Sequence, residues 1–112
     1  MLHHVALETR EADAEACVAF FALLGFARVE PPPTLRERAV WLARGTQQIH
    51  LLLTDDPIVA PAGHVAVVVD DYEATVARLG DVDPRAEHWG SPRCFARDPA
   101  GHVVEVMAFP PR

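Results

Sequence analysis

Four side chains with metal-ligand chemistry lie on runs that the sequence predicts to be strands. His4 and His64 begin two similar runs, HVAL in the first half of the chain and HVAV in the second. His50 in QQIHLLL and Glu105 in HVVEVMAF occupy matching places in two further apolar runs, one in each half. Their neighbours are apolar, so the two-residue period of a strand places these polar groups on the face opposite the core.

Three imidazoles and one carboxylate that converge on a cavity would suit a borderline divalent ion: Fe, Zn, Ni, Mn or Co. His4, His50 and His64 would bind such an ion as neutral ligands. Glu105 would be its anionic ligand and, where it detaches during turnover, the general base. The sequence therefore predicts a metal site of His4, His50, His64 and Glu105, with Glu105 as the catalytic residue.

Other aromatic and imidazole groups could line a substrate pocket around that ion, namely Trp41, His88, Trp89 and Phe109. His3 should point to the face opposite His4, outside the site. His102 follows a tight turn, where we expect it to be exposed. Arg93 and Arg97 flank Phe95 on one strand and are expected mostly in surface ion pairs.

The elements that must position these groups follow from periodicity and from turn residues. Residues 2–8 alternate as a strand, and residues 12–24 carry Ala16, Phe20, Leu23 and Leu24 at helical spacing before Gly25. FARVE, RAVWLA and QQIHLLL then predict three strands, the last two joined in a hairpin at Gly45. The segment 1–54 is therefore a predicted βαβββ unit.

The second part of the chain repeats this order. GHVAVVV predicts a strand, and Asp70 or Asp71 begins a short helix that ends at Gly80. PRAEH, PRCFAR and HVVEVMAF predict three more strands, with the turn DPAG before the last one. The segment 63–110 is thus a second βαβββ unit, and the whole chain, 1–112, is predicted to be one α+β domain in which tandem units form a curved mixed sheet.

Composition limits the partners of this domain. The formal net charge is −6, from 16 acidic and 10 basic residues, and no basic run is present, which disfavours nucleic acid and anionic membranes. No segment has the length and apolarity of a membrane span or a signal peptide. Cys17 and Cys94 fall in a predicted helix and strand, which indicates buried free thiols and a reducing compartment. We expect a soluble cytoplasmic protein with a small-molecule ligand.

The repeated units, the phrase FFALLGF at the end of the first helix, and RDPAGHVVEV in the last hairpin make nearly the whole chain resemble the vicinal oxygen chelate superfamily. That group includes glyoxalases, extradiol dioxygenases (dihydroxybiphenyl dioxygenase fold), fosfomycin resistance transferases and metal-free bleomycin resistance proteins. In its metal-binding members the ligands come from the first and last strands of each unit, which here are His4, His50, His64 and Glu105. Glyoxalase I has a carboxylate where this chain has His50, and Glu8 takes the place of its basic glutathione-binding residue.

Two hypotheses follow from the residues and the resemblance. The first is a metal-dependent isomerase or lyase, or a dioxygenase where the ion is iron, in which the metal polarises an oxygen-bearing substrate. The alternative is a metal-free protein of the bleomycin resistance type that binds and sequesters a small molecule. In either case we expect a homodimer, because exposed strand edges gain from being covered. The cavity could form within one chain or across that dimer.

Overall fold

The computed structural model describes residues 1–88 and 91–108 and contains two βαβββ units, as predicted. The first unit runs through β1 (His4–Thr9), α1 (Glu11–Ala22), β2 (Ala27–Val29), the short 3-10 helix η1 (Pro33–Leu35), β3 (Ala39–Arg44) and β4 (Gln47–Leu53). The second unit runs through β5 (His64–Val68), α2 (Tyr72–Leu79), β6 (Asp83–Arg85), β7 (Arg93–Arg97) and β8 (Val103–Met107).

Each unit builds one four-stranded mixed sheet. The strand orders are β1-β4-β3-β2 and β5-β8-β7-β6, so equivalent strands occupy equivalent places. In both sheets the first strand pairs in parallel with the last, and the remaining pairs are antiparallel. The second sheet therefore repeats the topology of the first.

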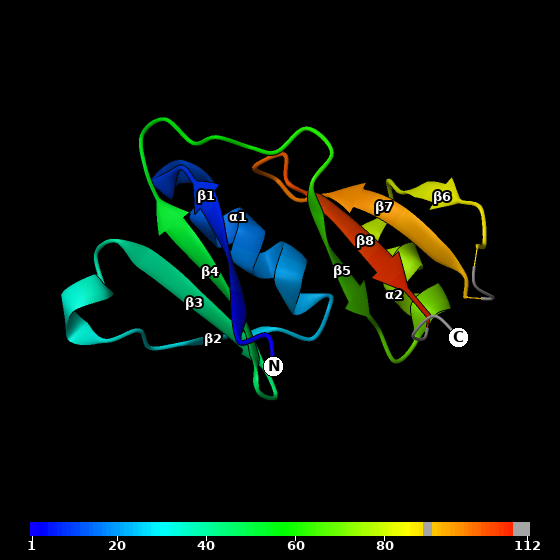
Figure 1. Ribbon diagram of the computed structural model, residues 1–112, viewed down its shortest axis with the longest axis horizontal. Helices are drawn as coiled ribbons and strands as arrows, with labels where there is room; N and C mark the ends of the chain where they lie inside the picture. Colours follow the sequence, from blue (N-terminus) through cyan, green and yellow to red (C-terminus); the bar gives the residue numbers. More distant parts are fainter. Residues whose placement is uncertain (89–90, 109–112) are drawn as a thin grey trace.

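The two units stand side by side, with β1 and β5 as neighbouring edges and both helices behind the sheets (Figure 1). One apolar core lies on the helix side and draws on both units. Its buried members include Phe21 of α1, Leu42 and Ile49 of the first sheet, and Val104 and Val106 of the second. The shared core joins the units through apolar burial, the main favourable contribution to folding.

The buried stripe of α1 differs from the one expected. Ala16 is exposed and Phe20 only partly buried, whereas the buried positions are Ala14, Cys17 and Phe21, followed by Leu24 after the helix. Two overlapping apolar stripes run along this segment because Phe20 and Phe21 are adjacent. The stripe that contains Phe21 faces the sheets, where the larger buried area is available.

The second strand of the second unit, β6, also differs from expectation. It spans Asp83–Arg85, whereas PRAEH had placed it at residues 84–88. Gly80 ends α2 with a positive φ of 77°, and the chain enters the strand shortly after it. Within the described residues, no helix has both the length and the apolar character needed to cross a membrane.

Candidate functional site

The first unit presents three stacked rings on the sheet face that the helices leave uncovered. Trp41 of β3 stands opposite His50 of β4; their ring centroids are 4.0 Å apart and their planes are inclined by 1°. The other side of the His50 ring stacks on His4 of β1, at 4.0 Å and 19°. The cross-strand register of β1, β4 and β3 produces this array, since all three residues project from the same face.

His50 is held in this stack as a neutral imidazole. The side chain is buried, at 6% exposure, and its Nε2 lies 2.7 Å from Oε1 of Gln48. That amide oxygen only accepts, so Nε2 carries the hydrogen and Nδ1 keeps its lone pair. Burial lowers the pKa of His50, and the nearby charges of His4 and His3 lower it further. A neutral ring with one free lone pair is the form that can bind a metal.

The equivalent face of the second unit carries charged groups instead. Nε2 of His64 lies 3.2 Å from Oε1 of Glu105, and Arg93 of β7 donates from Nη1 to Oε2 of the same carboxylate at 3.1 Å. The Glu105 and Arg93 side chains are 6% and 9% exposed. Phe95 lies beside the His64 ring at 4.9 Å. Both oxygens of the buried carboxylate are therefore engaged within the chain.

The four predicted ligands thus form two pairs, one on each sheet. His4 and His50 form the first half-site; His64 and Glu105 form the second. Within residues 1–88 and 91–108, no three His, Cys, Asp or Glu side chains are grouped so that they could hold one metal ion. The donor types fit a divalent metal, but their grouping in one chain does not.

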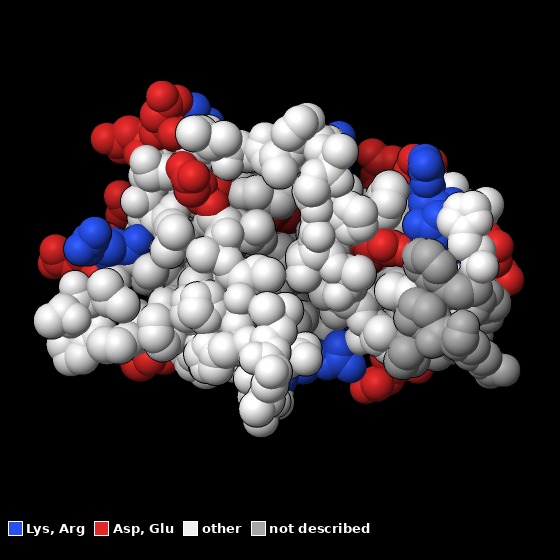
Figure 2. Space-filling view, in the orientation of Figure 1, with Lys and Arg blue, Asp and Glu red and all other residues white. Residues whose placement is uncertain are grey.

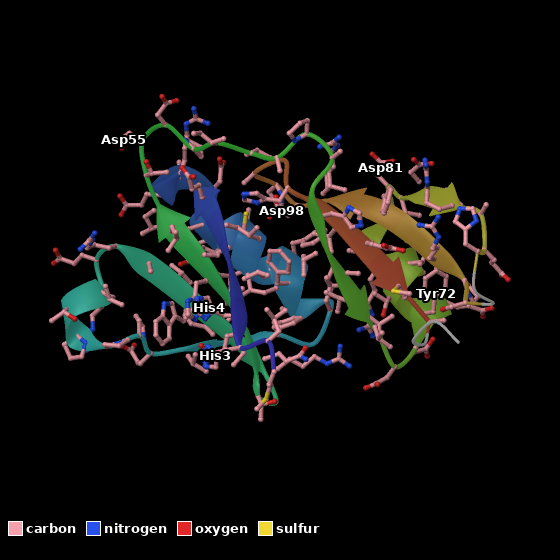
Figure 3. The ribbon with its side chains drawn as sticks, in the orientation of Figure 1. His3, His4, Asp55, Tyr72, Asp81 and Asp98 are labelled. Atoms are coloured by element: carbon pink, nitrogen blue, oxygen red, sulfur yellow. The ribbon has the colours of Figure 1, made fainter. Side chains whose placement is uncertain are left out.

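Both half-sites open onto the same side of the molecule. Figure 2 views this side and shows few charged side chains over its middle, with most of the acidic and basic groups towards the rim. Exposed Leu52 of β4, at 41%, adds apolar surface to it. Figure 3 places His4 and His3 at the lower end of the first unit. The side bearing the half-sites is therefore an open face rather than an enclosed cavity.

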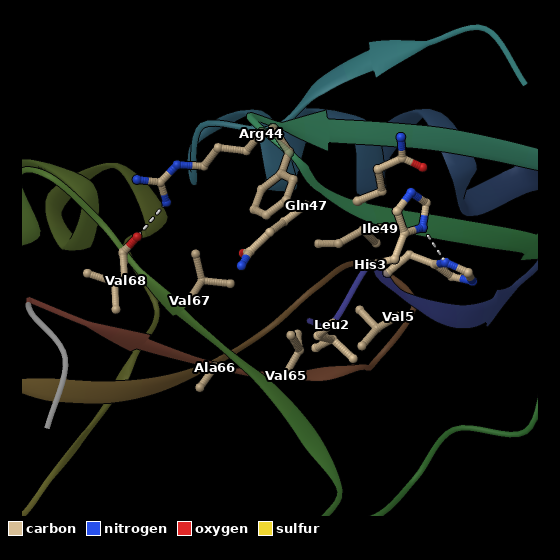
Figure 4. Close-up of a pocket in the computed structure, with 13 residues that line it drawn as sticks. Leu2, His3, Val5, Arg44, Gln47, Ile49, Val65, Ala66, Val67 and Val68 are labelled. Carbon is tan, nitrogen blue, oxygen red and sulfur yellow. Dashed lines mark hydrogen bonds between the residues drawn. The ribbon is translucent and has the colours of Figure 1, made fainter.

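Two cavities lie instead along the junction of β1 and β5. One of about 440 Å³ is lined by apolar side chains such as Val5, Val65 and Val67, with Arg44 and Gln47 at its edge (Figure 4). It reaches His4 but neither His50 nor Glu105. A second, of about 320 Å³, is lined by His64 and by residues at the end of β1. Each cavity touches one member of one half-site.

The weaker pocket candidates are only partly placed. Trp41 belongs to the first half-site, where it stacks on His50. His88 is exposed, and Trp89 and Phe109 lie outside the described residues. His3 is exposed beside His4, with the two Nδ1 atoms 2.9 Å apart. Cys17 and Cys94 are buried free thiols, as expected.

Three residues differ from the sequence-based expectation. His3 was expected on the face opposite His4, but its ring centroid lies 5.1 Å from that of His4 and 6.4 Å from that of His50. It precedes β1, so the alternation along the strand does not set its direction. His102 is buried at 5% exposure, not exposed, because the turn 98–101 packs against the end of β1 and brings the ring into the junction between units. Arg93 is not a surface residue but the buried partner of Glu105. The only sequence signal for this pair was that a basic and an acidic residue alternate with apolar neighbours on adjacent strands.

Comparison with known proteins bears on the fold. By sequence, the chain matches no family profile and no curated protein. By structure, it is similar to a glyoxalase family protein from Bacillus anthracis, with a TM-score of 0.83 and 24% identity over 96% of this chain and 93% of that one. The chain has the fold of the vicinal oxygen chelate superfamily.

Two further structures show how broadly this fold is shared. Lactoylglutathione lyase from Agrobacterium tumefaciens has a TM-score of 0.69 and 23% identity, with 96% of this chain and 92% of that chain covered. The fosfomycin resistance protein FosX from Mesorhizobium loti has a TM-score of 0.67 and 17% identity, with 98% and 92% covered. Proteins with different activities share this vicinal oxygen chelate fold, so the activity must be argued from the site.

Proposed function

We propose that this chain is a glyoxalase-like metalloprotein that acts on an oxygen-bearing small molecule and works as a homodimer. In this assembly the first half-site of one copy faces the second half-site of its partner. His4 and His50 of one chain and His64 and Glu105 of the other would then hold one divalent ion. A two-fold axis would generate two such sites per dimer.

The observation that carries this proposal is the placement of two complementary half-sites on one open face. Each supplies two donors, and each is too small alone for a metal centre with three or four protein ligands. The open face also leaves Leu52, two residues after His50 on β4, exposed to solvent. Covering such a face with a second copy would bury apolar surface and complete the ligand set at once.

The chemistry of the donors is consistent with this role. A bound divalent ion would supply Lewis acidity, polarising an oxygen of the substrate. The protein groups have separate tasks. Gln48 holds Nε2 of His50 and leaves Nδ1 free for a ligand, and Arg93 keeps Glu105 oriented towards His64. The Trp41 ring would form an apolar wall beside the site.

Complementation between two inactive variants tests the shared site. One chain carries His4→Ala and His50→Leu, and the other carries His64→Ala and Glu105→Gln. Each variant alone should bind no cobalt, whereas an equimolar mixture should recover about a quarter of the wild-type amount, since half of randomly paired dimers contain one intact site. Cobalt absorbance after gel filtration measures this recovery.

The same experiment distinguishes failure of the shared metal site from failure of the dimer. Recovery of no metal by the mixture, with wild type binding normally, would place all ligands within one chain. A wild type that sediments as a monomer at micromolar concentration would contradict the dimer itself. Two wild-type preparations, one of which carries an affinity tag other than polyhistidine, are mixed as the control for subunit exchange, and recovery of the untagged copy with the tagged one shows that exchange occurs.

A metal-free binding protein is the second candidate, and one observation favours it. Glu105 already has Arg93 on one oxygen and His64 on the other, so its charge is compensated without a metal ion. The stack of Trp41, His50 and His4 offers a flat aromatic edge for a planar ligand. Protein purified without an affinity tag that contains no metal, and does not take up cobalt, nickel, zinc, manganese or ferrous iron, would establish this alternative.

A further inference from the structure

Two side chains reach across the junction between the units in a reciprocal manner. Arg44, at the end of β3, donates to the carbonyl oxygen of Val68 in β5. His102, just before β8, lies with Nε2 2.7 Å from the carbonyl oxygen of Glu8 in β1. Glu8 stands as far along β1 from its first residue as Val68 stands along β5. The two acceptors are therefore equivalent positions of the repeat.

These contacts provide donors to backbone carbonyl groups on two strand edges. Among the residues that the structure describes, β1 pairs only with β4, and β5 only with β8, so the backbone groups along their other edges face the junction. In each case the last hairpin of one unit supplies a donor to the first strand of the other unit. The junction is thus held by one polar clamp near each end, beside the shared apolar core.

The two clamps differ in how they carry charge. The Arg44 guanidinium also lies 3.5 Å from Asp70 and stays charged at any accessible pH. His102 has acceptors on both ring nitrogens. Its Nδ1 is 2.6 Å from Oδ2 of Asp98, and its Nε2 faces the Glu8 carbonyl. A carboxylate and a carbonyl cannot donate, so both ring nitrogens must carry hydrogen and the ring is an imidazolium.

The surroundings of His102 support that charge. Asp98, 3% exposed, lies between the two units (Figure 3) and also accepts from the backbone N–H groups of Ala100 and His102. The hydrogen bond to Asp98 raises the pKa of His102, although burial alone would lower it. Geometry and charge agree on the protonated form.

The other charged and titratable groups around His102 come from several elements. α1 contributes the Cys17 thiol, which is hydrogen-bonded to the Asp98 side chain, and the carboxylate of Asp13. β1 contributes the Glu8 carboxylate, which accepts from the N–H of Ile58 at 3.3 Å. The remaining groups are His64 of β5, which lines the same cavity, and Arg97 at the end of β7, which donates to Gly101.

We propose that His102 is a proton-dependent latch: its imidazolium ties the end of β1 to the β7–β8 turn, and loss of one proton in alkaline solution releases that end while Arg44 keeps the other end closed. The proton that remains would stay on Nδ1, because the bond to a charged carboxylate is the stronger one. The bond to Glu8 is therefore the one that breaks. Release would open the 320 Å³ cavity beside His64. This latch does not depend on the proposed metal site.

The sequence makes the alkaline range easy to interpret. All ten basic residues are arginine, so no lysine titrates there. Burial raises the pKa of Cys17 to about 12, and burial also raises the pKa of Cys94 and of Tyr72. His102, whose pKa is raised by its hydrogen bond to Asp98, is therefore the group at the junction that we expect to lose a proton as the solution becomes alkaline.

The direct test is nitrogen NMR of the histidine rings in the full-length wild-type protein. At neutral pH, His102 should show hydrogen on both ring nitrogens, and its pKa should lie above about 6.5, the unperturbed value for histidine. On deprotonation, hydrogen should remain on Nδ1. A neutral His102 ring at pH 7 would overturn the proposal without any variant.

Hydrogen exchange tests the mechanical consequence. The amide of Thr54, bonded to Thr9 at the end of β1, should lose protection above the pKa of His102, after correction for the intrinsic exchange rate. The loss should be about tenfold for each unit by which the folded pKa exceeds the unfolded one. The amide of Val69, at the end of β5, should keep its protection.

Three variants complete the experiment. His102→Gln should remove the pH dependence of protection at the Thr54 amide. Arg44→Gln should lower the protection of the Val69 amide by the same factor at all pH values. His88→Gln, which replaces an exposed histidine that lines neither junction cavity, is the matched control and should behave as wild type. The latch would be overturned if the Thr54 and Val69 amides lost protection equally as pH rises. It would also be overturned if the pH-dependent loss of protection at Thr54 persisted in His102→Gln.

Discussion

The two half-sites occupy equivalent positions of a repeated fold, yet they hold buried polar groups in different ways. In the first, His50 is neutral and lies between two rings. In the second, Glu105 is charged and lies between a guanidinium and an imidazole. Burying a charge requires a partner, whereas a neutral ring requires only a single hydrogen bond. One topology can therefore position ligands with opposite electrostatic requirements.

This difference has consequences for substitution. Removing a member of the charged half-site leaves a buried charge without its partner, so the cost should appear in the free energy of unfolding. Removing a member of the aromatic half-site leaves no charge behind, so the cost should appear in ligand binding. Stability and binding measurements on matched variants can therefore separate the two halves.

The largest effect is expected for Glu105→Leu. The substitution leaves the buried Arg93 guanidinium without its carboxylate partner, and breaking a buried pair from one side costs about 3–5 kcal/mol. The midpoint of urea unfolding should fall accordingly. Glu105→Gln, which can still accept a hydrogen bond, should lose clearly less.

The double variant Glu105→Leu with Arg93→Met provides the control for this prediction. It removes both charges and should recover part of the lost stability. A double variant that is no more stable than Glu105→Leu alone would show that the pair is not the cause of the loss.

His50→Leu should instead separate binding from stability. The free energy of unfolding should change by less than about 1 kcal/mol, since the lost stacking is offset by removal of a buried polar ring. Metal affinity should fall by more than about tenfold, because even the loss of a ligand's orienting partner costs about 10–100-fold. Equal cobalt affinity of wild type and His50→Leu would remove His50 from the ligand set.

The two buried histidines, His50 and His102, should make the free energy of unfolding depend on pH in opposite directions. His50 has a lowered pKa, so stability is lost as pH falls below about 6.5, where the unfolded chain takes up the proton first. His102 has a raised pKa, so its contribution is complete below about pH 6.5 and is lost as pH rises through the folded value. The melting temperature, measured at acid, neutral and alkaline pH, should depend less on pH on the acid side in His50→Leu. In His102→Gln it should depend less on pH on the alkaline side.

The repeat itself was predictable from the sequence. Alternation along HVAL, HVAV, IHLLL and VEVMA assigned His4, His50, His64 and Glu105 to one side, and the strand register confirms that these residues share the side opposite the core. Such periodicity reflects local geometry, which single strands already determine. The sequence could not predict how far apart the two pairs lie, because that distance depends on how the sheets meet.

Long-range polar contacts were also beyond sequence reasoning. His102 was expected to be exposed because it follows a turn, and its acceptor, Glu8, lies 94 positions earlier in the chain. Arg93 and Glu105 come from different strands that pair only in the folded sheet. A turn residue or a strand arginine carries no local signal for such partners, since burial is decided by packing between elements.

The smallest expected effect concerns ring stacking, and it addresses the two half-sites together. The Trp41 and His50 rings are nearly parallel at 4.0 Å, whereas Phe95 and His64 are tilted by 57° at 4.9 Å. A double-mutant cycle of Trp41→Leu with His50→Leu should give a coupling of about 0.5–1.5 kcal/mol, the range for well-oriented aromatic pairs. The matched cycle of Phe95→Leu with His64→Leu should give a smaller value, because its rings overlap less. Equal couplings would mean that stacking geometry does not distinguish the two half-sites.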